Sequence, residues 1–156
     1  MKHRLRRAQA GAMVIEFALG LIIFLTFFLG VLDFSRMLWT WGAANEATRW
    51  GARTAVVCPR NAGAVLAHMQ KFLPQLTASQ LRVDWYGASG LDNSCTPATC
   101  TAVQVRIVGL DHVWISPIGW STGRLIAMPE FATWLPRESM GQDPDSATVC
   151  NAPAGA

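Results

Sequence analysis

The sequence predicts an α+β protein in which one long N-terminal helix, membrane-spanning in its first half, packs against a small, mainly antiparallel sheet domain. Residues 11–32 form a nearly unbroken apolar run, and apolar or small residues then recur at helical spacing to about residue 57. Later segments alternate between apolar and polar residues, as half-buried strands do. The 156 residues are enough for one membrane helix and one small domain.

The predicted transmembrane helix, residues 12–32, follows a basic leader peptide, residues 1–11. About 20 apolar residues cross a bilayer core as a helix, and this segment meets that length. The leader has no acidic residue, and its basic residues are Lys2, Arg4, Arg6 and Arg7. Because basic flanks tend to stay in the cytoplasm, we expect a cytoplasmic N-terminus and an outer domain beyond the helix.

Glu16 is the one charged residue within the apolar run. A carboxylate in that environment costs on the order of 2–3 kcal/mol or more, depending on its depth. Either Glu16 lies near the cytoplasmic edge and reaches water, or it meets a cation in an assembled state. The small-residue junction Gly11-Ala12 suggests a processing site, and cutting the chain there would create an α-amino group as that cation.

The outer domain is predicted to begin with the continuation of the same helix to about residue 57. The pair Cys58-Pro59 marks its end, because a residue before proline disfavours the α conformation. Asn61 is a suitable N-cap for a second helix at about residues 62–73, which Pro74 would stop.

Three strands are predicted in the outer domain, residues 33–140, at about residues 81–86, 102–110 and 125–135. In the second strand, the apolar residues at alternate positions should share the buried face. These residues are Val103, Val105 and Ile107.

The irregular connection at residues 114–124 is apolar, and it either folds back toward the membrane or covers the sheet. Four tryptophans are interpreted as core residues of the small domain: Trp85, Trp114, Trp120 and Trp134. Residues 141–156 have too little to bury, apart from Cys150, and are expected to form a flexible tail.

The four cysteines lie on the predicted outer side, where disulfides persist. Cys95 and Cys100 bracket a short loop that is well suited to closure, which leaves Cys58 to pair with Cys150. A free thiol stays open as an alternative. A zinc site is disfavoured, because the sequence has no C-x2-C pair.

Charge and motifs exclude several classes of function. Without the leader, nine basic and ten acidic residues remain, a formal charge of −1, so no basic surface is left to follow a nucleic-acid backbone. The sequence has no G-x-S-x-G elbow, phosphate-binding glycine loop or H-E-x-x-H motif. We therefore expect no catalytic residue, cofactor, metal or small-molecule substrate.

The basic leader, Gly11, Glu16 five residues later and an apolar helix that enters a small domain together resemble type IV prepilin-type proteins. Within that class the chain most resembles the TadE-like pseudopilins of the tight-adherence (Tad/Flp) pilus machinery. Three segments carry this resemblance: Gly11 to Leu19 (GAMVIEFAL), Val31 to Phe34 (VLDF) and Met128 to Gly141. Major Flp-type pilins are much shorter and usually have Tyr after the glutamate, so Phe17 and the outer domain favour a minor pseudopilin.

The resemblance implies a pilin-like fold and a specific pathway. A prepilin peptidase would cut after Gly11 and leave Ala12 as the new N-terminus. Glu16, with Phe17 beside it, would serve recognition and assembly by neutralising the amino terminus of a neighbouring subunit. The implied partners are the peptidase, other pilins or pseudopilins through the N-terminal helix, and the inner-membrane pilus assembly platform.

The implied location is the bacterial inner membrane, single-pass with a periplasmic C-terminal domain, or a pilus that incorporates the protein. Two alternatives differ in processing. The first is an uncleaved single-pass envelope protein with a partner-binding outer domain. The second is a soluble domain released by signal peptidase, which the long apolar run and the lack of an A-x-A-like exit disfavour.

Overall fold

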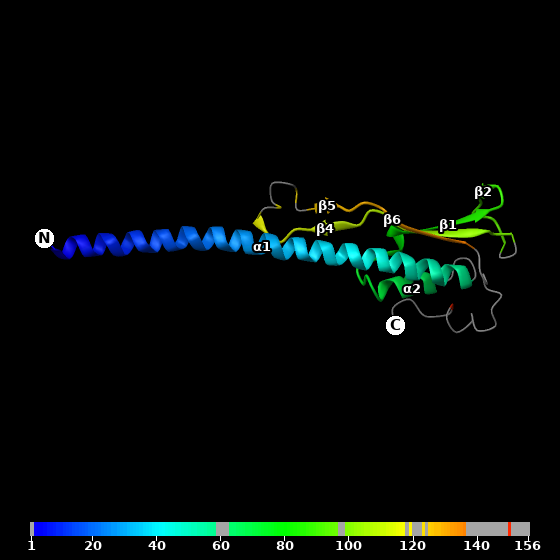
Figure 1. Cartoon of the computed structure of the whole chain (residues 1–156), viewed down its shortest axis with the longest axis horizontal. Helices are drawn as coiled ribbons and strands as arrows, with labels where there is room; N and C mark the ends of the chain where they lie inside the picture. Colours follow the sequence, from blue (N-terminus) through cyan, green and yellow to red (C-terminus); the bar gives the residue numbers. More distant parts are fainter. Residues whose placement is uncertain are drawn as a thin grey trace. The chain divides into compact units, whose positions relative to one another are not determined.

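A computed structural model describes residues 2–58, 63–96, 99–117, 119, 123, 125–136 and 150, with the backbone alone for residues 2–10. The helices are α1 (Lys2–Val57), α2 (Ala64–Gln70) and a short 3-10 helix, η1 (Ala78–Gln80). The strands are β1 (Leu81–Gly87), β2 (Gly90–Leu91), β3 (Ala102–Ile107), β4 (Asp111–Val113), β5 (Leu125–Ala127) and β6 (Phe131–Pro136). One long apolar helix with a small antiparallel sheet domain confirms the predicted α+β class (Figure 1).

The chain forms two compact units. The anchor unit consists of Met1–Met37 and His112–Ile126, and the sheet unit consists of Leu38–Asp111 and Ala127–Ala156. The anchor unit therefore contains the first part of α1 and nearly all of β4 and β5, which pair as a two-stranded sheet. The segment after β4 thus clusters with the apolar half of the helix rather than with the main sheet.

The sheet unit is built on a four-stranded sheet in the order β2-β1-β3-β6, and each neighbouring pair of strands is antiparallel. The predicted alternation in β3 is confirmed, because Val103, Val105 and Ile107 are all fully buried. The second part of α1 packs on this sheet. Trp41 meets Phe131 edge to face, with ring centroids 5.2 Å apart.

Small side chains let α1 approach its neighbours closely. Ala44, Ala47 and Ala52 are completely buried on the packed face of the helix. At Gly51, an added Cβ would lie 2.6 Å from Met69 Sδ and 3.3 Å from Val105 Cγ1, so no side chain larger than hydrogen fits without a shift. The absence of a Cβ at this position therefore helps α2 and β3 to contact the same stretch of α1.

The helices differ from the prediction at their N-terminal ends. α1 begins at Lys2 and not at Ala12, because the leader is rich in Arg, Ala, Leu and Gln, which are strong helix formers. Its end at Val57 coincides with the expected end. α2 is shorter than the predicted helix at residues 62–73, and the residue before it is Gly63, while Asn61 lies outside the described residues.

α2 also ends before Pro74, since Phe72 N already donates to Met69 O in a tightened last turn. The strand predicted at residues 102–110 ends at Ile107, and Gly109 then takes a positive φ of 64°. The strand predicted at residues 125–135 is two strands in two different sheets. Pro129 has no N–H for a ladder, and the chain leaves one sheet for the other at this point.

Of the four tryptophans assigned to the core, Trp85 is buried as predicted. Trp134 is more than half exposed on β6, so its assignment to the core is wrong. Trp114 lies half-buried in the anchor unit. Trp120 lies outside the described residues.

Both expected disulfides are present, and no cysteine is free. Cys58, directly after α1, bonds to Cys150, and Cys95 bonds to Cys100. The first bond ties the C-terminal residues to the end of the long helix. Of the expected flexible tail, only Cys150 is described, and it is buried.

Removal of the Cys58–Cys150 bond should destabilise the sheet unit more than removal of the Cys95–Cys100 bond. The first closes a loop of 92 residues and the second a loop of 5, which correspond to about 4–5 and about 2 kcal/mol of loop-closure entropy. Guanidinium unfolding of the two double Ser variants, in detergent and followed by tryptophan fluorescence, measures both. Equal losses or the reverse order would contradict the expectation.

Gly51→Ala should lower the free energy of unfolding, because the added Cβ would lie 2.6 Å from Sδ of Met69, a side chain that is fully buried and must shift. Overpacking of this kind costs roughly 1–3 kcal/mol. Gly42→Ala is the matched control on the same helix, since an added Cβ there meets nothing within 4 Å. The control should gain up to about 1 kcal/mol of helix propensity, and a gain in both variants would rule out the tight contact.

Candidate functional site

The predicted processing and assembly residues all lie on α1. Gly11, Ala12, Glu16 and Phe17 are exposed, and an added Cβ at Gly11 would meet nothing within 4 Å. The Gly11-Ala12 peptide bond is part of the helical backbone, so cutting it requires the helix to open locally. Glycine is about 1 kcal/mol poorer than alanine as a helix former, which lowers the cost of opening at this point.

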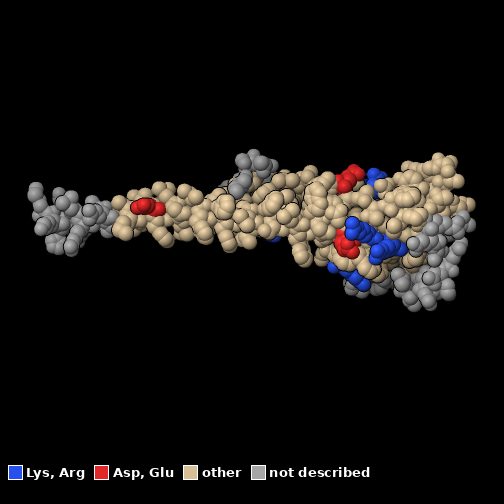
Figure 2. All heavy atoms as spheres, in the orientation of Figure 1, with Lys and Arg blue, Asp and Glu red and all other residues tan. Residues whose placement is uncertain are grey.

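Glu16 has no charged neighbour along the helix. The ion pairs given by the described residues do not involve Glu16, and the residues three or four positions away from it are Ala12, Met13, Leu19 and Gly20. In Figure 2 the first part of the helix after the grey N-terminal residues shows one acidic group, and the sequence has Glu16 as the one charged residue within residues 11–32. The Glu16 carboxylate is therefore open to a cation from outside this chain or to water.

The helix around Glu16 is apolar and uncovered. Its most apolar 18-residue window has a mean hydropathy of 2.5, and 0% of that window is buried. Thr26, a polar side chain within it, donates its hydroxyl to Ile22 O at 2.8 Å and so needs no outside partner. By length and composition, this is a helix that can cross a membrane.

Asp33 forms a second site directly after the apolar run. Its side chain accepts hydrogen bonds from Arg36 Nη1 at 3.0 Å, from Ile115 N at 3.0 Å and from Ser116 N at 2.6 Å. The residue is only 1% exposed. All three partners donate, which suits an ionised carboxylate because it can only accept.

The structural role of Asp33 was not predicted from the sequence. One part of this site has a signal in the sequence: Arg36 follows Asp33 by three residues, which is the spacing of an ion pair on a helix. The partners Ile115 and Ser116 stand 82 and 83 residues away in the chain, and no local pattern indicates them.

His112 lies close to this site, on β4. Burial lowers the pKa of its imidazole below the ordinary 6.5, and the Arg36 charge lowers it further, while Asp33 partly opposes both effects. The ring meets Trp114 edge to face, with centroids 6.0 Å apart. The cation that contacts Asp33 is Arg36, whose Nη1 lies 3.0 Å from Asp33 Oδ1.

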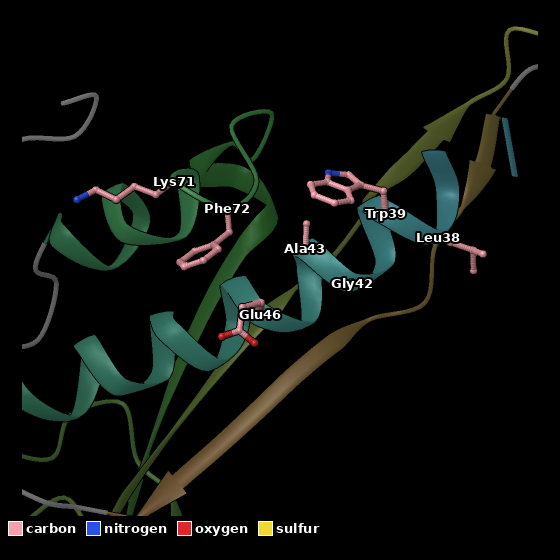
Figure 3. A pocket seen from close by; sticks show the side chains of 7 residues that line it. All are labelled: Leu38, Trp39, Gly42, Ala43, Glu46, Lys71 and Phe72. Atoms are coloured by element: carbon pink, nitrogen blue, oxygen red, sulfur yellow. The ribbon is translucent and has the colours of Figure 1, made fainter. Parts of the chain in front are cut away.

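The sheet unit carries an apolar groove of about 420 Å³ (Figure 3). Its lining residues come from α1 and from the turn after α2: Leu38, Trp39, Gly42, Ala43, Glu46, Lys71 and Phe72. Glu46 is already engaged, since it accepts from Trp50 Nε1 at 2.9 Å. The lining offers apolar contact and no pair of polar groups placed for catalysis.

The described residues contain no group of three His, Cys, Asp or Glu side chains that could hold a metal ion. Asp111 and His112 are neighbours on β4 but differ in exposure, since Asp111 is exposed and His112 is buried. They do not form a catalytic pair in this arrangement.

A single uncovered apolar helix joined to an α+β domain is consistent with a single-pass membrane protein. The model of a protein family described as TadE-like protein matches residues 11–53, and the resemblance to TadE-like proteins is confirmed over this stretch. The match covers Gly11, Glu16 and Asp33, and it fits a membrane protein associated with the Tad pilus. No curated protein and no solved structure matches the chain.

Replacing Asp33 by Ala should release the segment after β4, because the buried N–H of Ser116 loses its acceptor at a cost of about 1–3 kcal/mol and the part-buried N–H of Ile115 loses the same acceptor. Hydrogen exchange of a peptide that contains Ile115 and Ser116, in the full chain in detergent, should become at least roughly tenfold faster. Asp111→Ala is the control, since this neighbouring acid is exposed. Unchanged protection in Asp33→Ala would mean that the carboxylate does not hold this segment.

Proposed function

We propose that this protein is a membrane-anchored minor pseudopilin, processed by a prepilin peptidase after Gly11, that takes part in assembly of a Tad/Flp-type adhesion pilus. The observation that carries the proposal is Glu16, an exposed carboxylate in an uncovered apolar helix, five residues after Gly11 and inside the TadE-like match. A carboxylate in such a helix raises the free energy of the membrane-inserted chain, and Glu16 has no partner among the described residues. Contact with a cation on another subunit would offset that cost.

Cleavage would change the surroundings of Glu16. In the uncut chain Glu16 lies in the interior of a helix that begins at Lys2. In a chain that begins at Ala12 it would be the fifth residue, close to the partly positive N-terminal end of the helix, which favours a carboxylate. Processing would also create the α-amino group on each subunit, and Glu16 of one subunit would neutralise that group on the next.

The proposed role gives each segment of the chain a location. In the proposal, the leader at residues 1–11 is cytoplasmic, residues 12–32 span the inner membrane, and the domain at residues 33–140 with the tail at residues 141–156 is periplasmic. The two disulfides support this orientation, because such bonds persist in the oxidising periplasm. The remaining partners would be other pilins or pseudopilins, through α1, and the inner-membrane assembly platform.

The alternative is a single-pass envelope protein that is never cut and binds a partner through its outer domain. The apolar groove lined by Trp39 and Phe72 favours it, since such a surface can receive a partner without any processing of the N-terminus. The two functions differ in the mass of the mature chain.

The N-terminal mass of the protein purified from membranes of its native host tests the processing. We expect a chain that begins at Ala12. Gly11→Leu should retain the leader, because the small residue at the junction is replaced by a bulky one. A chain from the native host that begins at Met1 would reject the pseudopilin and leave the uncleaved envelope protein.

Glu16→Gln should separate assembly from processing. The variant keeps the size of the side chain and removes the charge, so cleavage should continue while recovery of the protein with other pilus components falls severalfold. Glu46→Gln is the matched control on the same helix, outside the apolar run, and should assemble normally. If Glu16→Gln is processed and assembled like the unmodified chain, the assigned role of Glu16 is wrong.

A further inference from the structure

The anchor unit contains a second apolar groove, formed where the segment after β4 meets α1. It has a volume of about 340 Å³, and its lining residues are Phe27, Gly30, Val31, Phe34 and Trp114. Three of these, Phe27, Gly30 and Val31, belong to the predicted span at residues 12–32. Trp114 therefore lies at the level of the last turns of that span.

Hydrogen bonding allows this backbone to enter an apolar environment. Unpaired N–H groups in lipid cost several kcal/mol each, so an irregular segment normally stays out of it. Asp33 accepts from both Ile115 N and Ser116 N, and β4 and β5 pair with each other. Ile115 N, Ser116 N and the groups that pair β4 with β5 thus have partners within the protein and do not depend on water.

After Asp111, which is exposed at the start of β4, the outward side chains of this segment are apolar. Val113 is 52% exposed, Ile115 58% and Leu125 54%, whereas His112 points inward and is buried. The sequence from Val113 to Gly123 contains no charged residue. From His112 onward, this segment buries its histidine and exposes its aliphatic residues, which is the polarity expected of contact with lipid, not with water.

We propose that Val113, Trp114 and Ile115, together with β5, form a second membrane-contacting element, inserted into the outer leaflet beside the end of the span, with the exposed Asp111 at the level of the lipid headgroups. The partner is the bilayer itself, and phospholipid acyl chains fill the groove between Trp114 and α1. Lipid is the occupant because the groove is continuous with the surface of the span, whose neighbours in a bilayer are acyl chains. The inference rests on the membrane location of α1 in the proposed function.

Depth-dependent quenching tests the proposal on the full chain. Ile115→Cys is labelled with the fluorophore NBD under non-reducing conditions, where the four native cysteines are held in disulfides. The protein is reconstituted into phosphatidylcholine vesicles with or without a phospholipid that carries a nitroxide high on its acyl chain. Leu125→Cys provides a second, independent position on β5.

Two reference labels make the outcome decisive. Phe27→Cys reports the span, and Arg49→Cys reports the part of α1 well past it in the sequence. We expect labels at Ile115 and Leu125 to be quenched about as strongly as the label at Phe27, and severalfold more than the label at Arg49.

If the label at Phe27 is quenched but the labels at Ile115 and Leu125 are quenched as weakly as the label at Arg49, the proposal is overturned. The membrane anchor itself would still stand. No quenching at Phe27 would reject the membrane anchor itself, and this proposal with it. If the label at Ile115 is not quenched by the lipid but shows energy transfer between two labelled copies of the chain, the exposed face at Ile115 contacts a second subunit. This result would also overturn lipid contact.

Discussion

The rest of the structure depends on how the apolar surface of α1 is removed from water. The first and second parts of this helix differ in what covers that surface. In its first part the large apolar side chains are exposed, so their cover must come from outside the chain. Further along, Ala44, Ala47 and Gly51 present so little side chain that strands and a second helix pack directly on the backbone. One continuous helix thus has two surfaces suited to different surroundings.

Two carboxylates on this helix, Asp33 and Glu16, differ in burial and in the number of their partners. Asp33 is buried, and its three donors leave it fully engaged within the chain. Glu16 is exposed and has no ion pair among the described residues. A charge with internal partners stabilises the fold, while a charge without them is available to another molecule. This contrast makes Glu16 the better candidate for assembly and Asp33 the better candidate for holding the segment after β4.

The features that could be predicted from the sequence are those that depend on local patterns of residues. Apolar runs, helical spacing and the alternation of Val103, Val105 and Ile107 are local, and the short loop between Cys95 and Cys100 indicated both disulfides. The sequence did not predict β4, which has only three residues and depends on pairing with β5. The exposure of Trp134 was missed for a similar reason, since which face of β6 is buried is decided by the elements packed on the sheet.

The family match ends within α1, so the residues that it covers depend on others that it does not. Asp33 lies inside the match, while its partners Ile115 and Ser116 belong to the outer segment. Without that segment, Asp33 would lose both backbone donors and keep Arg36 as its remaining partner among those described. The segment after β4 therefore completes the hydrogen bonding of Asp33. The helix α1 on its own, without this segment, would lose the support that Asp33 has here.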